Sequence, residues 1–172
     1  MHPLDKFQFC PVCGSKRWKI HNFKSKKCED CGFTYYANPS AANVALIVND
    51  RDELLVVRRK NDPAKGTLDL PGGFTDMEES GEQGVIREVK EETGLTVSRA
   101  EYLFSIPNLY TYSGMVIHTL DMFFRCEVEN FDNMQAMDDA EEAEWIAMKD
   151  IKPDEFGLDS VREGLVRFLK KN

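Results

Sequence analysis

The chain has 172 residues, enough for one ordinary domain and a small additional module. With 42% hydrophobic and 30% charged residues it is typical of a globular protein, and it has neither an apolar run long enough for a membrane span nor a cationic start leading into an apolar targeting segment. We therefore expect a cytoplasmic protein without membrane contact, and the net charge of −8 argues against a protein that coats nucleic acid.

Four of the five cysteines form two Cys-x-x-Cys pairs near the N-terminus, Cys10/Cys13 and Cys28/Cys31. Each pair places two thiols on one tight turn with a glycine after it, and two such turns can close a tetrahedral zinc site. A redox pair or disulfides are the alternatives, and both suit a cytosolic chain less well. Residues 1–36 are therefore predicted to be a zinc ribbon, whose Zn²⁺ is structural because the protein fills all four ligand positions.

The predicted ribbon is basic, although the whole chain is acidic. It holds seven lysine or arginine residues against three acidic ones, a net charge of +4, which leaves −12 for the remainder. A basic surface with aromatic side chains can bind nucleic acid. Because the basic excess is modest, we expect instead no nucleic-acid partner, with the aromatic side chains packed around the zinc and against the next domain. These side chains are Trp18, Phe23, Phe33, Tyr35 and Tyr36.

Residues 37–172 are predicted to form a single α/β domain. Apolar strands are expected at 43–48, 54–57, 97–105, 115–128 and 144–148, with a turn at 49–52, loops at 106–114 and 130–140, and an amphipathic closing helix at 159–170 that has Ser160 as a candidate cap. Strands that flank one short helix and end in another predict a mixed sheet between helices.

Five reactive or charged side chains lie in or beside these strands. Arg58, Arg59 and Lys60 follow the second strand, and Lys65 lies in the next loop; they either meet a phosphate or form a solvated edge, and both interpretations stay open. Cys126 lies in a predicted strand without a histidine nearby in sequence. We expect it to be a buried structural thiol rather than a nucleophile.

A short helix is predicted to begin near Gly81 and to end at Thr93. Ser80 and Gln83 form a capping-box pair before it, and Gly94 suits the left-handed residue after its last turn. Val85, Ile86 and Val89 give this helix a small apolar face for docking on the sheet.

Glu88, Glu91 and Glu92 are spaced i, i+3 and i+4, so their side chains share one face of this helix. Like-charge pairs at such spacings cost a few tenths of a kcal/mol each, and a hard divalent cation with oxygen ligands is the natural candidate to offset that cost. A solvated acidic face is the alternative. Two neighbours favour the cation: a Pro-Gly-Gly turn ending at Gly73, whose carbonyls can approach a ligand, and Arg87, which can orient a carboxylate by bidentate contact.

The segment 73–95 resembles the box of the Nudix hydrolases, and every fixed position of the box is filled. The matching residues are Gly73, Glu79, Arg87, Glu88, Val89, Glu91, Glu92, Gly94 and Leu95, with five residues between the first two and seven between Glu79 and Arg87. The resemblance implies an α/β/α sandwich with a mixed sheet, here preceded by the zinc ribbon. It also implies hydrolysis of a nucleoside diphosphate linked to another moiety.

The resemblance assigns a role to each part of the site. Mg²⁺ or Mn²⁺ would be held by Glu88, Glu91 and Glu92, with the turn at Gly72 and Gly73 as a cofactor-binding element and the Gly72 carbonyl as an extra ligand. Glu79 and Arg87 would hold the carboxylates in place. A last carboxylate would come from a later loop, before Trp145. Of the candidates Asp138, Asp139, Glu141 and Glu142, the offset from Trp145 favours Asp139 and then Glu142.

The order of ribbon and box resembles the bacterial NADH pyrophosphatase branch of the family. Residues 105–113 keep Ser105, Pro107 and Ser113 of the signature that follows the box in that branch, but lack its tryptophan and two further prolines. We therefore expect an adenine dinucleotide or ADP-sugar such as NADH, NAD or ADP-ribose, with the leaving group undetermined. A non-catalytic nucleotide-sensing or nucleic-acid-binding regulator and an RNA-end pyrophosphohydrolase are the alternatives. By analogy with the family a homodimer is possible.

Overall fold

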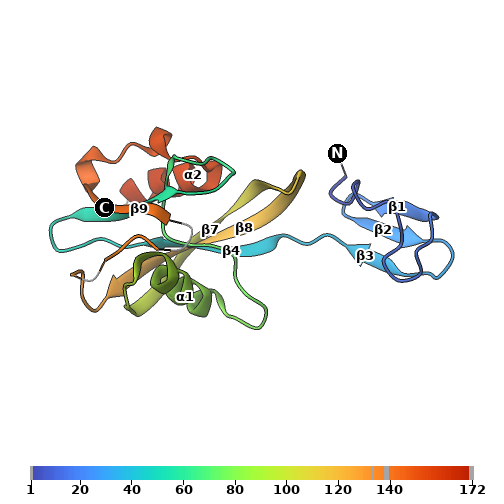
Figure 1. Ribbon diagram of the computed structural model, residues 1–172, viewed down its shortest axis with the longest axis horizontal. Coiled ribbons are helices and arrows are strands. Elements are labelled where there is room, and N and C mark those ends of the chain that lie inside the picture. The colour runs from blue at the N-terminus through green and yellow to red at the C-terminus, as the bar shows by residue number, and fades with distance from the viewer. Residues whose placement is uncertain (1, 133, 138–139, 171–172) are drawn as a thin grey trace. The chain divides into compact units, whose positions relative to one another are not determined.

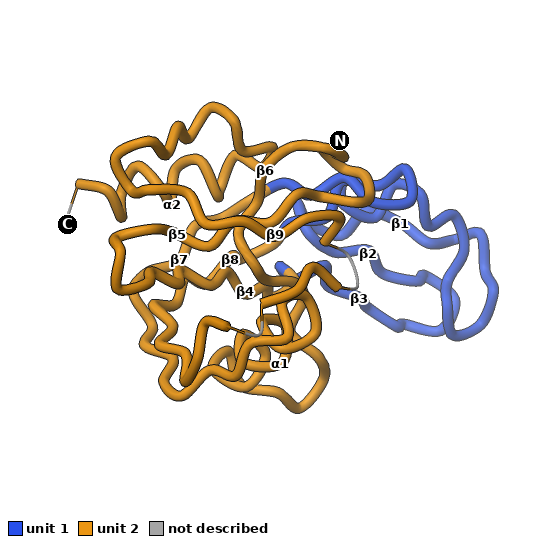
Figure 2. Tube along the Cα trace, turned by 60° about the vertical axis from the view of Figure 1, so that its left-hand side comes forward, with its two compact units in different colours: residues 1–39, 109–118 blue, residues 40–108, 119–172 orange. Residues whose placement is uncertain are grey.

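A computed structural model describes residues 2–132, 134–137 and 140–170 (Figure 1). Within these residues, none of the helices is both long enough and apolar enough to cross a membrane. The chain forms two compact units, one made of residues 1–39 with 109–118 and the other of residues 40–108 with 119–172 (Figure 2).

The first unit contains a small antiparallel sheet with the strand order β1-β2-β3. Its strands are β1 (Trp18–Asn22), β2 (Ser25–Cys28) and β3 (Thr34–Tyr36). Trp18 stacks on Phe33 at a centroid distance of 6.0 Å and packs with the buried Cys10 and Cys28. The expectation that the aromatic side chains surround the cysteines is therefore confirmed for these two rings, whereas Phe23, Tyr35 and Tyr36 are exposed.

The second unit is an α/β/α sandwich, as predicted. One sheet has the order β4-β8-β7 and contains a parallel pair, β4 with β8; the other has the order β6-β5-β9 and is antiparallel. The strands are β4 (Ser40–Leu46), β5 (Glu53–Arg59), β6 (Leu68–Asp69), β7 (Val97–Tyr112), β8 (Met115–Val128) and β9 (Ala140–Ala147). The helices are α1 (Gly81–Thr93) and α2 (Asp159–Leu169), with short 3₁₀ turns at Met148–Asp150 and Pro153–Glu155.

Alternating residues of β4 and β5 divide the interior into two cores, because successive side chains of a strand point to opposite faces. On one face Ala45 and Leu55 pack with Val85 and Val89 of α1. On the other face Leu46 and Leu54 belong to the core that contains Val161, Leu165 and Phe168 of α2. The two helices therefore cover opposite sides of the strands (Figure 1). Ile86, predicted to dock with Val85 and Val89, is instead 39% exposed.

The prediction of a loop at 106–114 is wrong. Strand β7 continues to Tyr112 and forms a hairpin with β8 through a two-residue turn at Ser113 and Gly114, both of which have positive φ. Such a turn matches the twist of the flanking strands. The pairing with β8 decides the conformation here, and that partner is not visible in the local sequence, where Pro107 and Asn108 are typical of a loop.

The predicted cap of the last helix is also wrong. Helix α2 begins at Asp159 after Leu158, without a side-chain cap. Ser160 is buried, and its hydroxyl donates to Asp121 Oδ2 at 2.5 Å, while Thr119 donates to Asp121 Oδ1 at 2.6 Å. A buried carboxylate requires hydrogen-bond donors, and the Ser160 hydroxyl therefore donates to Asp121 instead of capping the helix.

Candidate active site and metal centre

Helix α1 carries most of the predicted site and has the ends that the sequence predicts. The Ser80 hydroxyl accepts from the Gln83 N–H at 3.2 Å, and the Gln83 side chain accepts from the Ser80 N–H at 2.8 Å. Gly94 adopts a left-handed conformation with φ 71°, and its N–H donates to Lys90 O. Both ends of the helix are thus fixed by local hydrogen bonds, so the side chains along it have a rigid support.

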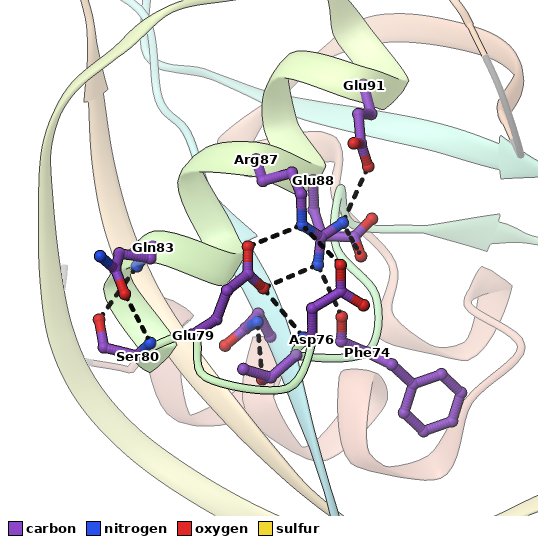
Figure 3. A network of polar contacts seen from close by, with 10 residues as sticks. Phe74, Asp76, Glu79, Ser80, Gln83, Arg87, Glu88 and Glu91 are labelled. Atoms are coloured by element: carbon purple, nitrogen blue, oxygen red, sulfur yellow. Dashed lines mark hydrogen bonds and ion pairs between the residues drawn. The ribbon is translucent and has the colours of Figure 1, made fainter.

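Arg87 lies at the centre of a network of carboxylates (Figure 3). Its Nε and Nη2 donate to the two oxygens of Glu79 at 2.9 and 3.0 Å, a bidentate contact. Its Nη1 donates to Glu88 Oε1 at 2.9 Å and to Glu91 Oε2 at 2.8 Å, and Nη2 also donates to the Phe74 carbonyl at 2.9 Å. One guanidinium therefore ties the loop before the helix to two of the three predicted metal ligands.

The network also sets the charge state of Glu79. Hydrogen bonds from Arg87, and then from the Asp76 N–H at 2.9 Å, stabilise the ionised form and hold the pKa of Glu79 below its ordinary value. The hydrogen bonds to Glu79, Glu88 and Glu91 in turn raise the pKa of Arg87. The repulsion expected between the glutamates of this helix is thus offset at least in part by Arg87, which contacts both Glu88 and Glu91.

Glu92 differs from the other two glutamates because it is buried, with 8% of its surface exposed. Its Oε2 accepts from the Gly72 N–H at 2.9 Å, so the Pro-Gly-Gly turn meets the helix at this residue. The Met137 N–H donates to the Glu92 carbonyl at 2.8 Å, and the Gln135 N–H donates to the Thr93 carbonyl at 3.0 Å. The loop before β9 is therefore attached to the last turn of α1.

The two glycines of the turn are required by close packing. Gly72 has φ 154°, and a Cβ at this position would lie 2.1 Å from the carbonyl oxygen of Asn43. A Cβ on Gly73 would lie 2.5 Å from Glu88 Oε1. The Gly73 carbonyl accepts from the Asn43 N–H at 2.7 Å, and the Thr75 N–H donates to Ala41 O at 3.1 Å, so the turn runs beside β4. Its predicted role as a cofactor-binding element stays a prediction.

Asn43 also belongs to this site, although it lies outside the segment 73–95 that carries the predicted site residues. Its side chain is buried, and its Nδ2 donates to Thr75 Oγ1 at 3.0 Å. The same nitrogen would lie 2.3 Å from a Cβ on Gly84 of α1. Asn43 Oδ1 is buried without a hydrogen-bond partner among the described residues. One strand residue thus contacts the turn and the helix together; a polar residue inside an apolar strand is the signal that could have revealed it.

Of the two preferred candidates for the late carboxylate, the structure describes Glu142 but not Asp139. Asp139, like Asp138, lies outside the described residues. Glu142 is on β9 opposite Arg58 of β5, and its Oε2 accepts from Arg58 Nε at 3.0 Å. Arg58 also lies 3.6 Å from Glu144 Oε1. Glu142 is thus engaged by a cation from the neighbouring strand, and its assignment as ligand or base stays a prediction.

Arg58 and Arg59, the last two residues of β5, contact other groups of the protein. Arg59 Nη1 donates to Asp69 Oδ2 at 2.5 Å in a largely buried ion pair, and Arg59 Nε donates to the Pro63 carbonyl at 2.7 Å. Since Arg58 pairs with Glu142, both arginines contact protein groups in this structure. Cys126 is buried, and burial raises the pKa of its thiol to about 12, which confirms the structural thiol.

The four N-terminal cysteines converge as the spacing predicts. The Cys10 and Cys31 sulfurs are 3.7 Å apart and those of Cys13 and Cys28 are 3.6 Å apart, with all four within 4.8 Å of one another. Four thiolates around a zinc ion at about 2.3 Å would be separated by about 3.8 Å. The backbone N–H of Cys31 lowers the pKa of Cys28 to about 7, whereas the pKa values of Cys13 and Cys31 are raised, despite backbone hydrogen bonds from Ser15 and Phe33, by the neighbouring thiols and by burial. This cluster can therefore hold a metal ion.

Comparisons with known proteins point to one family. A sequence model of the NUDIX domain matches residues 37–166. The chain is 32% identical over 120 residues to a protein of Vibrio atlanticus named NAD-capped RNA hydrolase NudC, covering 70% of this chain and 44% of that protein. It is 31% identical over 138 residues to the ADP-ribose pyrophosphatase of Methanocaldococcus jannaschii, covering 79% of this chain and 78% of that protein. The chain thus spans less than half the length of the NudC relative.

A solved structure supports the fold. The crystal structure of a NUDIX hydrolase from Nitrosomonas europaea superimposes with a TM-score of 0.74, at 21% sequence identity, over 96% of this chain and 92% of that one. At this identity the likeness concerns the fold alone, and the fold it indicates is the sandwich with an N-terminal module described above.

Proposed function

Since this chain belongs to the NUDIX domain family, we propose that it is a divalent-metal-dependent hydrolase that cleaves the diphosphate bond of a nucleoside diphosphate linked to another moiety. The observation that carries the proposal is the Arg87 network, because it presents Glu88 and Glu91 from a capped helix while a turn holds Glu92. A solvated acidic helix face would need neither a central guanidinium nor a turn packed against a buried glutamate.

The donor set suits Mg²⁺ or Mn²⁺, because both prefer carboxylate oxygens. Glu88, Glu91 and Glu92 would hold the ion, which when bound would neutralise the diphosphate and lower the pKa of a bound water molecule. Glu79 fixes the Arg87 guanidinium through two parallel hydrogen bonds, and Arg87 in turn orients the Glu88 and Glu91 carboxylates. Both are therefore positioning residues rather than ligands in this proposal.

The names of the relatives narrow the substrate class. One is called an NAD-capped RNA hydrolase and the other an ADP-ribose pyrophosphatase. NAD and ADP-ribose share an adenosine diphosphate whose second phosphate bears another group. We propose NADH, NAD or ADP-ribose as the substrate type, with hydrolysis between the two phosphates and AMP as one product.

The remaining proposals concern the zinc ribbon, the hydrolase domain, the compartment and the oligomeric state. Residues 1–36 would form a ribbon that holds one structural Zn²⁺ on Cys10, Cys13, Cys28 and Cys31, and residues 37–172 would form the hydrolase domain. The cysteines of this chain are free thiols in the structure, which suits a reducing compartment such as the cytoplasm. Homodimer formation stays a prediction by analogy.

A substrate panel tests the proposal. Purified protein is incubated with NADH, NAD or ADP-ribose and either Mg²⁺ or Mn²⁺, and the products are identified by chromatography. We expect AMP from at least one of the three. Hydrolysis of nucleoside triphosphates alone would contradict the substrate class, and no hydrolysis with either metal would favour a nucleotide sensor without activity.

A further inference from the structure

We propose that the zinc ribbon binds single-stranded nucleic acid. The binding surface would be a groove on the β1-β2 sheet together with exposed aromatic rings of the same unit. The groove, called the basic groove below, is lined by Lys19, Ile20, His21, Lys27, Cys28, Glu29 and Gly32. This inference is independent of the proposed hydrolysis, because it concerns residues of the first unit alone.

The basic groove contains a pair of cations that the fold leaves uncompensated. Lys19 of β1 and Lys27 of β2 are directly opposite each other in the antiparallel register, and both are exposed. Like charges at such positions repel. Neither lysine forms an ion pair with a residue that the structure describes, and the acidic residue in the groove, Glu29, is paired with Arg17 at 3.2 Å. An anion bound between the two lysines would remove the repulsion.

Exposed aromatic rings of the first unit favour a nucleic acid over a single anion. Phe23, at the turn between β1 and β2, is 81% exposed, and Lys24 Nζ lies 6.0 Å from its ring centre. Phe9 is 53% exposed, with Lys16 Nζ at 6.0 Å from its ring centre. Rings that stack on bases, next to cations that meet phosphates, are the means by which proteins bind single strands without reading their sequence.

The distribution of charge supports the same partner. The net charge of −8 argued against nucleic-acid binding, but it is the sum of +4 on residues 1–36 and −12 on the rest. Lys26, whose Nζ donates to the Phe7 carbonyl at 2.8 Å, is buried and serves the fold. Lys19 and Lys27 remain as exposed cations of the groove. A polyanion would therefore be drawn to the ribbon and repelled by the second unit.

Fluorescence anisotropy of the full chain tests this inference. The probe is an uncapped 20-nucleotide single-stranded RNA of mixed sequence with a fluorescein label, titrated at several salt concentrations. We expect binding that weakens as salt rises. The double variant Lys19→Gln/Lys27→Gln should bind about 10-fold more weakly at low salt and reduce the slope of log affinity against log salt by about 1.4, since each phosphate contact on a single strand contributes about 0.7. Phe23→Ala should weaken binding about 10-fold with little change in the slope.

The matched control is Lys149→Gln/Lys170→Gln, which removes the same charge from exposed positions of the second unit. It should bind RNA like the wild-type protein. Zinc content and hydrolysis of free ADP-ribose, measured on every variant, report the ribbon's integrity and the proposed function separately. No RNA binding by the wild-type protein, or equal losses in the two double variants, would overturn the inference. The first of these results is also the one expected if the groove docks on a protein.

Discussion

Arg87 and Asn43 are the two residues that join the parts of the site. The sequence predicted a site role for Arg87 but not for Asn43. Arg87 was predicted to orient a carboxylate, and it contacts three of them. Asn43 lies 32 positions before Thr75, the residue that its amide contacts. A contact of that length is set by the packing of β4 beside the turn, so a polar residue inside an apolar strand could mark Asn43 but could not identify Thr75 as its partner.

Replacing Asn43 should impair the site more than the fold. Asn43→Ala removes the hydrogen bond to Thr75 and also an unpaired buried oxygen, so we expect the free energy of unfolding to fall by only about 1 kcal/mol. Because the turn next to Glu88 loosens, kcat/KM for the diphosphate should fall about 10-fold. Asn49→Ala is the control: its side chain holds the Arg51 and Glu53 N–H groups of a turn, so stability should fall while turnover is kept. Equal turnover in the two variants would exclude a positioning role for Asn43.

The ion pair of Arg87 and Glu79 predicts a pH dependence of stability. The pKa of Glu79 is lower in the folded protein than in the unfolded chain, so its contribution is present above the unfolded value, about 4.3, and is lost as pH falls through the folded value. Arg87→Gln should therefore lower the Tm at pH 7, and the difference from wild type should shrink below about pH 4. Arg99→Gln, which breaks an exposed pair with Glu101, should change the Tm little at either pH. A constant difference across the range would contradict the assignment.

Among the elements, helix α1 and strand β8 were predicted with their bounds, whereas the second half of β7 was not. Helix α1 has its predicted ends because its cap and its terminal glycine lie within the segment itself. Strand β7 was predicted to end at 105 but runs to Tyr112, because β8 supplies hydrogen bonds that outweigh Pro107 and Asn108. Helix α2 begins at Asp159, as predicted, but its candidate cap Ser160 instead donates to the buried Asp121 carboxylate.

Helix α1 should not tolerate alanine at Gly84, although alanine is the better helix former. The gain in propensity is about 1 kcal/mol. The added Cβ would lie 2.3 Å from Asn43 Nδ2, a distance that forces the amide to move. We expect Gly84→Ala to lower the free energy of unfolding by 1 kcal/mol or more, roughly in the range for overpacking. Glu82→Ala, on the exposed side of the same helix, should stay within about 0.5 kcal/mol of wild type.

The Asn43 contact can be isolated by combining two substitutions. If the amide causes the clash, Gly84→Ala should cost less in an Asn43→Ala background, so the two effects will not add. Chemical denaturation of the four proteins measures this coupling. Additive effects would show that Gly84 is required for a reason other than Asn43.

At the level of the whole molecule, the ribbon has too few buried apolar residues to fold without its metal. Its buried apolar side chains are Leu4, Cys10, Trp18 and Cys28, with Phe33 partly buried against them. Purified protein should contain one zinc per chain, and Cys28→Ser should abolish zinc binding and the order of the ribbon, because metal binding supplies most of its folding free energy. Cys126→Ala, which removes a cysteine of the second unit, should keep the full zinc content. Zinc-free protein with an ordered ribbon, seen by NMR, would contradict this account.

The two-unit organisation was predicted only in outline. The spacing of the cysteines indicated a separate ribbon, but residues 109–118, from the tip of the β7–β8 hairpin, group with residues 1–39 in the structure. A sequence pattern gives no information on which unit a distant hairpin tip joins.

The central claim, that helix α1 carries metal-dependent hydrolysis, is tested most directly by comparing Glu92→Gln with Glu82→Gln. Turnover of ADP-ribose, NADH or NAD, whichever the wild-type protein cleaves, is measured against Mg²⁺ concentration. Glu92→Gln should lower the rate by about 100-fold or more and require more Mg²⁺, since it removes a charge from the proposed ligand set. Its stability without metal should stay within about 1 kcal/mol of wild type. Glu82→Gln should keep near-normal turnover and metal dependence. Equal turnover and equal metal dependence in both variants would contradict the account.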